Sequence, residues 1–151
     1  MNFPVGKVVL KGTIPFDFES IAKSLVDSGF NGYIIQTVKS SCIEESVLFF
    51  RDGKMYASFA ECLLVKASFK GREALNFFLN ETKGKGYFQV VELARSQVDL
   101  VTAFDEELLL PPNLSLKDVA KTVPSVFSDN FRAEKKEEGV FETYGLGELK
   151  Q

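Results

Sequence analysis

The chain has 151 residues, a formal net charge of −3 and an isoelectric point near 5.1, and 45% of its residues are hydrophobic. This length suits one globular domain, or one domain with an extension. Lys and Arg are scattered among acidic residues instead of forming a basic patch. Because nucleic acids and anionic membranes select for such patches, we expect neither as a partner.

The location of the protein follows from what its sequence lacks. No apolar run approaches the roughly 18 residues of a membrane span. Residues 1–6 lack the basic and apolar regions of a signal peptide. Two cysteines, Cys42 and Cys62, do not make a disulfide framework in a chain of this size. We therefore expect a cytoplasmic protein.

The first half of the chain predicts one strand, one helix and a meander. Residues 8–10 are typical of a strand, and Asp17 then suits the N-cap of a helix that ends at Gly29. The apolar residues of this helix recur on one face. They are Phe18, Ile21, Ala22 and Leu25. Further strands are expected at residues 33–38 and 43–50.

The segment Arg51-Asp52-Gly53-Lys54 predicts a hairpin turn built on Asp52 and Gly53, with a return strand at residues 55–63. A two-residue turn would set Glu44 opposite Glu61, which like-charge repulsion disfavours. A three-residue loop would set Cys42 opposite Cys62 and gather apolar side chains on one face. We favour the second register. Small buried side chains are the default interpretation of the cysteines, with a disulfide or redox role as the alternative.

The second half predicts two more helices around one strand. A helix is expected at residues 73–80, with Ala74, Leu75 and Phe78 inward, and Gly84-Lys85-Gly86 ends it. A strand follows at residues 87–93.

Ser96 then suits the N-cap of a third helix, which Pro111-Pro112 ends. Its predicted buried stripe consists of Leu100, Val101, Phe104 and Leu108. Together these elements predict an α+β fold: a mostly antiparallel sheet of about five strands, with a central meander and helices packed on one face.

Beyond Pro112 the composition shifts toward short helical patterns at residues 115–121 and 124–136. The second pattern repeats apolar residues at Val123, Phe127 and Phe131. We therefore expect an α+β domain at residues 1–110 and a helical C-terminal extension at residues 111–151. The extension is expected to pack on its own domain or on a partner.

The chain contains no His. This excludes Ser-His-Asp and Cys-His nucleophiles and removes the commonest metal ligand. Gly84-Lys85-Gly86 follows a predicted helix and precedes a strand, which is the reverse of a phosphate-binding loop. We expect no catalytic residue, no cofactor and no metal.

The 15 Phe residues are many for one small core. Phe50 and Phe77 lie off the inward faces assigned above, and Phe127 and Phe131 line one side of the predicted tail helix. These four residues are the candidate interaction surface, for a protein partner or for a homodimer. The leading hypothesis is a non-enzymatic interaction or adaptor module. The alternative is a small-molecule-binding sensory domain with a pocket between sheet and helices.

Several segments together suggest a family. They are the helix at residues 18–28, the hairpin Val47-Leu48-Phe49-Phe50-Arg51-Asp52-Gly53-Lys54-Met55-Tyr56-Ala57, the helix start Gly71-Arg72-Glu73-Ala74-Leu75, and Gly86-Tyr87-Phe88-Gln89-Val90. Over about residues 12–110 this pattern resembles PATAN-type domains, found at the amino terminus of a bacterial response regulator, and related uncharacterised archaeal proteins. The resemblance implies a protein–protein interaction role in prokaryotic signalling and no catalytic residues.

Overall fold

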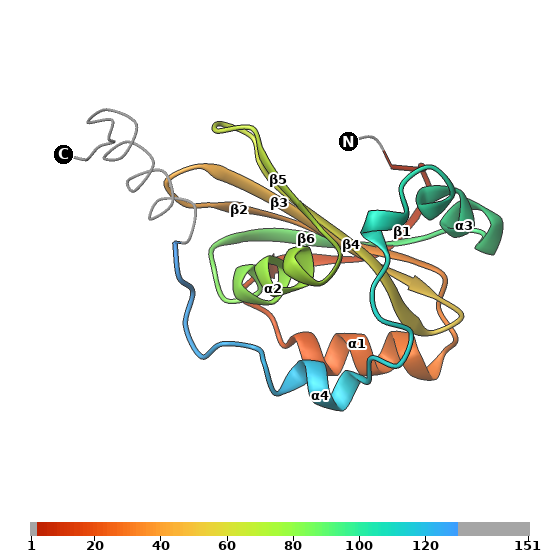
Figure 1. Cartoon of the computed structure of the whole chain (residues 1–151). Helices are drawn as coiled ribbons and strands as arrows, with labels where there is room; N and C mark the ends of the chain where they lie inside the picture. The colour runs from red at the N-terminus through yellow and green to blue at the C-terminus, as the bar shows by residue number, and fades with distance from the viewer. Residues whose placement is uncertain (1–2, 130–151) are drawn as a thin grey trace.

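Six strands form one antiparallel sheet in the order β1-β6-β2-β3-β4-β5 (Figure 1). The computed structural model describes residues 3–129. The strands are β1 (Lys7–Ile14), β2 (Gly32–Lys39), β3 (Ile43–Arg51), β4 (Lys54–Cys62), β5 (Ala67–Lys70) and β6 (Gly86–Glu92). The helices are α1 (Phe18–Asp27), α2 (Gly71–Glu81), α3 (Arg95–Ala103), α4 (Leu116–Ala120) and a short 3-10 helix, η1 (Glu106–Leu108). The predicted α+β fold is confirmed.

The order of the strands leaves β1 and β5 at the two edges of the sheet. The meander β2-β3-β4 forms its centre, and β6 lies antiparallel between β1 and β2. The sequence analysis missed β5, which has only four residues and leads directly into α2.

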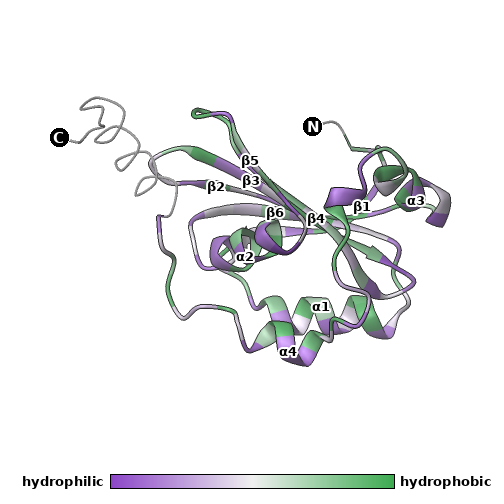
Figure 2. Ribbon diagram, viewed as in Figure 1, coloured by the Kyte–Doolittle hydropathy of each residue, from purple (hydrophilic) through white to green (hydrophobic). Residues whose placement is uncertain are grey.

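The helices α1, α2 and α4 cover one face of the sheet, and α4 packs beside α1 (Figure 1). Asp17 caps α1 as expected, with its carboxylate accepting from the Ser20 amide, and Gly29 follows the helix with a φ of 67°. The core between these layers contains Phe18, Leu48 and Phe78. Hydrophobic and hydrophilic residues alternate along α1 and α4, as expected for helices with one buried face (Figure 2).

The opposite face is covered near one end by α3 and η1. There Val98 and Leu108 are fully buried against Phe49 and its neighbours in a second apolar cluster. The expectation of helices on one face therefore holds for α1, α2 and α4, while α3 lies on the other side (Figure 1). Because both faces of the central hairpin are covered, its strands are apolar on both sides.

The predicted buried stripe of α3 is wrong at two positions. Leu100 is 56% exposed and Phe104 is 88% exposed. Polar contacts set the rotation of this helix: Asp99 accepts a hydrogen bond from Arg51 at 2.5 Å, and Thr102 bonds the hydroxyl of Tyr56 at 2.9 Å. These bonds turn the Val98 side of the helix inward and leave the Leu100 side in solvent.

The β3–β4 turn is confirmed, but the favoured register is wrong. Asp52 and Gly53 have φ values of 49° and 77°, so the turn has two central residues in the left-handed region. A register shift beside Phe49 then pairs Phe49 with Ala57 and moves Met55 to the opposite face. Neither expected register forms beyond the bulge.

Like charges do meet in the observed register. Glu45 lies opposite Glu61, and Cys62 lies opposite Glu44. Burial first, and then the charge of Glu61, raise the pKa of Glu45. The repulsion used to choose between registers is therefore present and tolerated, because two buried apolar faces determine the pairing.

We expect Gly53→Val to destabilise the protein by about 1 kcal/mol or more. A side chain is strained at this φ, and a Cβ here would lie 2.6 Å from the Val26 carbonyl oxygen. Gly53→Asn is the matched control, since Asn tolerates the left-handed region but has the same Cβ. Urea unfolding should give midpoints in the order Gly, Asn, Val, and an unchanged midpoint for Val would contradict the turn geometry.

The C-terminal part of the described chain is mostly irregular. Ser115 caps α4, close to the first predicted tail helix. The second predicted helix is wrong for residues 124–129, which contain no helix. Residues 121–129 instead run from α4 past α2 toward the β2–β3 turn (Figure 1), and we call them the strap. Phe131 and the rest of that predicted helix lie outside the described residues.

Candidate functional site

Two glutamates meet in the core between the sheet and α2. Glu44 comes from β3 and Glu81 is the last residue of α2, and both have no exposed surface. The Ser46 hydroxyl donates to Glu81 Oε1 at 2.6 Å, and the Ser40 hydroxyl donates to Glu44 Oε2 at 2.5 Å. Within residues 3–129, no Lys or Arg forms an ion pair with either carboxyl group. This is an unusual arrangement, since buried charges are normally paired.

A proton held by the pair reduces the cost of burying both groups. Burial, and next the hydrogen bond to Glu44, raise the pKa of Glu81 well above its ordinary range. Burial also raises the pKa of Glu44, against the lowering effect of hydrogen bonds from Glu81 and Ser40. Two carboxyl groups that share a proton keep it to higher pH than an isolated glutamate. We infer that Glu81 donates its proton to Glu44.

Gln36 determines the donor-to-acceptor direction of the hydrogen bonds in this network. Its Nε2 donates to Ser46 Oγ at 3.0 Å and to the Phe78 carbonyl at 2.7 Å. Since Ser46 accepts from Gln36, its own proton is directed to Glu81. Three buried oxygens have no other donor in the described part of the chain: Gln36 Oε1, Glu44 Oε1 and Glu81 Oε2. A proton shared between the carboxyl groups satisfies two of them.

This pair gives the stability a definite pH dependence. A glutamate whose pKa is raised in the folded state binds more protons there than in the unfolded state. Its contribution is therefore fully present below the ordinary glutamate pKa and is lost as pH rises through the raised value. Relative to Glu81→Gln, the wild type should lose stability from pH 4 upward. Urea midpoints of both proteins across pH 4–9 test this, and parallel curves would contradict it.

The strap closes over the edge of this network. Ser128 and Asn80 exchange two hydrogen bonds, with the Asn80 amide donating to the Ser128 carbonyl at 2.8 Å and the Ser128 amide donating to Asn80 Oδ1 at 2.9 Å. Asp129 accepts from the Ser41 amide and hydroxyl at 3.2 and 3.0 Å. The negative charge of Asp129 raises the pKa of Glu44. The strap and the carboxyl pair are therefore electrostatically coupled.

Apolar contacts hold the rest of the strap. Val123 and Phe127 pack against the core beneath α1 and α2. A Cβ on Gly84 would lie 3.2 Å from the Phe127 ring and 2.8 Å from Val38, so this glycine permits the ring to approach. The strap is thus anchored by apolar side chains along its length and by hydrogen bonds at its end.

Cys42 and Cys62 are joined by a disulfide beside the same network. Cys42 lies in the β2–β3 turn and Cys62 ends β4, and both are buried. Phe69 and Phe77 pack next to them, with their rings stacked 4.1 Å apart. The disulfide alternative therefore holds, although the two cysteines do not face each other in the ladder.

We expect reduction of this disulfide to destabilise the protein by about 2 to 4 kcal/mol, because it closes a loop of 20 residues in the unfolded chain. Urea unfolding with and without a phosphine reductant measures the change. The Cys42→Ala/Cys62→Ala double variant is the control, and its midpoint should not respond to the reductant. An equal response in both proteins would contradict the prediction.

A second feature is the outer edge of β1. This strand pairs only with β6, so its other side presents free backbone groups in the described structure. Val8, Val9 and Leu10 are each close to half exposed. Beside them a hollow of about 370 Å³ lies between β1 and α1. Its lining is mainly apolar: Val9, Leu10, Ser20, Ile21, Ser24, Leu25 and Val90. We call this surface the β1 groove.

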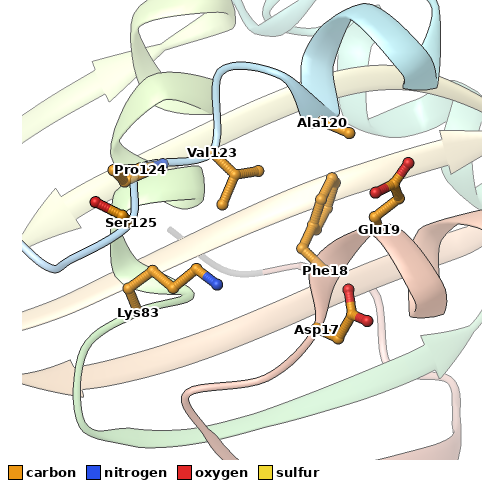
Figure 3. Close-up of a pocket in the computed structure, with 8 residues that line it drawn as sticks. All are labelled: Asp17, Phe18, Glu19, Lys83, Ala120, Val123, Pro124 and Ser125. Atoms are coloured by element: carbon orange, nitrogen blue, oxygen red, sulfur yellow. The ribbon is translucent and has the colours of Figure 1, made fainter.

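A smaller hollow of about 300 Å³ lies where the strap passes the start of α1. Figure 3 shows Lys83 on one side of it, Asp17 and Glu19 on the other, and Val123 near Phe18 between them. The Asp17 carboxylate that lines it already caps α1. We assign it no ligand.

The four predicted interaction residues do not form one surface. Phe50 has no exposed surface and packs against Phe30, so its assignment to an interaction surface is wrong. Phe77 stacks on Phe69, and Phe127 packs against the core. The structure brings none of these three together, and Phe131 lies outside the described residues.

Sequence reasoning missed the carboxyl pair. It correctly kept Glu44 and Glu45 from forming a pair, because adjacent strand residues face opposite sides. The signal for Glu44 was the alternation that places it on the same face as Ser46, Leu48 and Phe50. For Glu81 no signal existed, since its partner Ser46 is 35 residues away.

Two kinds of site can be checked directly in residues 3–129: metal-binding groups and membrane-spanning helices. No group of three or more His, Cys, Asp or Glu side chains in residues 3–129 could hold a metal ion. Over the same residues, no helix is both long enough and apolar enough to cross a membrane. The arrangement offers a buried carboxyl pair, a strap and an open strand edge.

The fold and these surfaces define a small α+β domain with an open sheet edge. The chain belongs to a family described as uncharacterized proteins conserved in archaea (DUF2226), whose family model matches residues 1–105. The expected likeness to uncharacterised archaeal proteins is therefore confirmed. No curated protein and no solved structure matches the chain.

Proposed function

We propose that this protein is a non-enzymatic interaction module that binds an extended segment of a partner protein along the β1 edge. The observation that supports it best is the combination of an eight-residue edge strand with exposed apolar side chains and an adjoining groove. A partner strand can pair with the free backbone groups while its alternate side chains enter the groove. The opposite edge, β5, is too short to offer this.

Charge selects the kind of partner. Lys7 and Lys11 flank the exposed apolar residues, and neither forms an ion pair in the described part of the chain. Because of the register shift between Val8 and Leu10, they span three residues of the neighbouring strand, from Glu92 to Gln89, or about 10 Å at a rise of about 3.3 Å per residue. A two-fold pairing of β1 with a second copy would gather four lysines. The charges therefore favour an apolar segment with acidic residues three positions apart.

Two features limit indiscriminate pairing at this edge. β1 has a register shift between Val8 and Leu10, and the flanking lysines repel a second β1. Natural sheets use bulges and edge lysines in this way to prevent aggregation. Such an edge is compatible with a specific partner and unfavourable for self-association.

The groove also bears on the alternative, a small-molecule-binding sensory domain. Ligand pockets usually combine an apolar cavity with a few convergent polar groups. The polar groups of the β1 groove are the Ser20 and Ser24 hydroxyls, and one side of the groove is the open strand edge. This geometry favours an extended peptide. The resemblance to PATAN-type domains extends the proposal to prokaryotic signalling.

The test is peptide binding measured by fluorescence anisotropy. A labelled octapeptide with Val and Ile between two Glu three positions apart should bind, and the same peptide with Lys in place of Glu should bind at least tenfold more weakly. Lys7→Glu/Lys11→Glu should reverse this preference, and Lys117→Glu on α4 is the control. Absence of binding at millimolar peptide, or equal binding of both peptides, would overturn the proposal.

Light scattering tests the alternative that a second copy of the chain occupies the β1 edge. A dimer at micromolar concentration that Leu10→Glu converts to a monomer would show that a second copy occupies the edge. The proposed acidic partner would then be wrong.

A further inference from the structure

We propose that the Glu44–Glu81 pair acts as a proton-dependent latch, which keeps the strap closed while the pair holds its shared proton and releases it when that proton is lost. This inference concerns the opposite end of the sheet from the β1 groove and is independent of the proposed function.

The first support for the latch is the set of contacts that connect the carboxyl pair with the strap. Both carboxyl groups have no exposed surface, and the strap is hydrogen-bonded to Ser41 and Asn80 beside them. Asn80 directly precedes Glu81 and holds Ser128 through two hydrogen bonds. The Ser40 hydroxyl holds Glu44, and its neighbour Ser41 holds Asp129. Glu81 therefore directly follows one anchor of the strap, and Ser40, which binds Glu44, directly precedes the other.

The charges around the pair determine the direction of the response. Asp129 from the strap raises the pKa of Glu44 through its charge, and Glu45, on the other face of β3, raises that of Glu81 in the same way. All are acidic. Glu81 also lies at the C-terminal end of α2, where the helix dipole disfavours negative charge. Loss of the shared proton thus places a second negative charge in a buried acidic site.

Opening the strap reduces the electrostatic repulsion between these negative charges. With the strap released, water reaches the pair and Asp129 moves away from Glu44. The open state therefore has the lower pKa, and the closed state binds more protons. By linkage, the closed state predominates at low pH and is lost as pH rises through the pKa of the closed pair. For one linked proton, the ratio of open to closed molecules rises about tenfold per pH unit between the pKa of the open state and that of the closed pair, and is constant above the latter.

Release would uncover an apolar surface. Val123 and Phe127 leave the core, and Val38 and Phe18 lose their cover. The latch thus converts a change in proton concentration into exposure of apolar side chains that are otherwise shielded.

The experiment uses the whole chain with one fluorescent reporter. Because the chain has no Trp, Phe127→Trp provides a single indole at the buried part of the strap. Its emission maximum should move to longer wavelength, and its quenching by acrylamide should increase at least threefold, as pH rises from 5 to 9. Circular dichroism across the same range should show that the sheet stays folded.

Three further variants, each made with the reporter, decide the mechanism. Glu81→Gln removes the titrating group and should keep the indole buried throughout the range. Glu44→Gln should do the same, and serves if the first variant does not fold. Glu73→Gln, on the exposed side of α2, should titrate as the parent protein does. Ser41→Ala removes an Asp129 anchor and should move the midpoint to lower pH.

Two results would overturn the latch. One is an indole whose emission and quenching do not change between pH 5 and 9 in the parent protein. The other is a transition in Glu81→Gln and Glu44→Gln with the same midpoint as in Glu73→Gln, since the titrating group would then lie elsewhere.

Discussion

Truncation after Leu110 should lower the melting temperature by about 10 °C or more and increase the tendency to aggregate. The segment removed includes Val119, which has no exposed surface, and partly buried side chains that pack against the main core. These are Leu114, Leu116, Val123 and Phe127. Burying one such side chain contributes about 1.5 to 3 kcal/mol, which the entropy of ordering the segment offsets in part. A net loss of about 3 kcal/mol corresponds to this shift.

The reference for this experiment is a chain truncated after Asp129, which keeps every contact described above. Light scattering on both proteins separates two roles of the extension. If residues 111–129 cover their own domain, both proteins are monomers and only the shorter one loses stability. If the extension joins two copies, the shorter chain should change from dimer to monomer. Equal melting temperature and mass for both proteins would contradict the packing of α4 and the strap.

The extent to which this fold follows from the sequence depends on how local each signal is. Asp17, Gly29 and the apolar spacing between them predict α1 correctly, because caps and helical periodicity act within a few residues. The same holds for the turn at Asp52 and Gly53. The signals for these elements lie within the elements themselves, so their positions could be predicted from the sequence.

The predicted rotation of α3 and the predicted β3–β4 register were wrong because contacts between residues far apart in sequence determine both. The face that α3 buries is set by the bond between Asp99 and Arg51, which are 48 residues apart. The pairing of β3 with β4 depends on a bulge that serves two apolar faces at once. Neither contact leaves a periodic trace in the sequence, so amphipathic patterns alone chose the wrong side of α3 and the wrong register.

The Glu44–Glu81 pair could not be predicted from the sequence because it also depends on contacts between distant residues. A glutamate is ordinarily exposed, so Glu81 gave no indication of its burial. Its position became clear only when α2, β3 and the strap were assembled around it. Polar residues that disagree with local patterns are often at functional positions, which is why the pair is a better candidate than the phenylalanines were.

Phe50→Ala should destabilise the protein by about 3 to 5 kcal/mol, whereas Phe104→Ala should change stability by about 0.5 kcal/mol or less. The sequence alone predicts the reverse, with Phe104 in a buried stripe and Phe50 at a surface. In the structure Phe50 has no exposed surface, and its ring meets the edge of the Phe30 ring at 6.2 Å. Its removal leaves a cavity between β3 and α1, which the surrounding core can only partly fill.

Phe104 is the matched control, since it is the same residue type at 88% exposure. Urea unfolding at constant pH compares the two variants, and circular dichroism checks that each retains the fold. Both substitutions delete the same atoms, and the expected difference between them exceeds the change of about 1 kcal/mol or less that helix and strand propensities contribute. Equal losses would mean that α3 packs with Leu100 and Phe104 inward, and that the Asp99–Arg51 bond does not set its rotation.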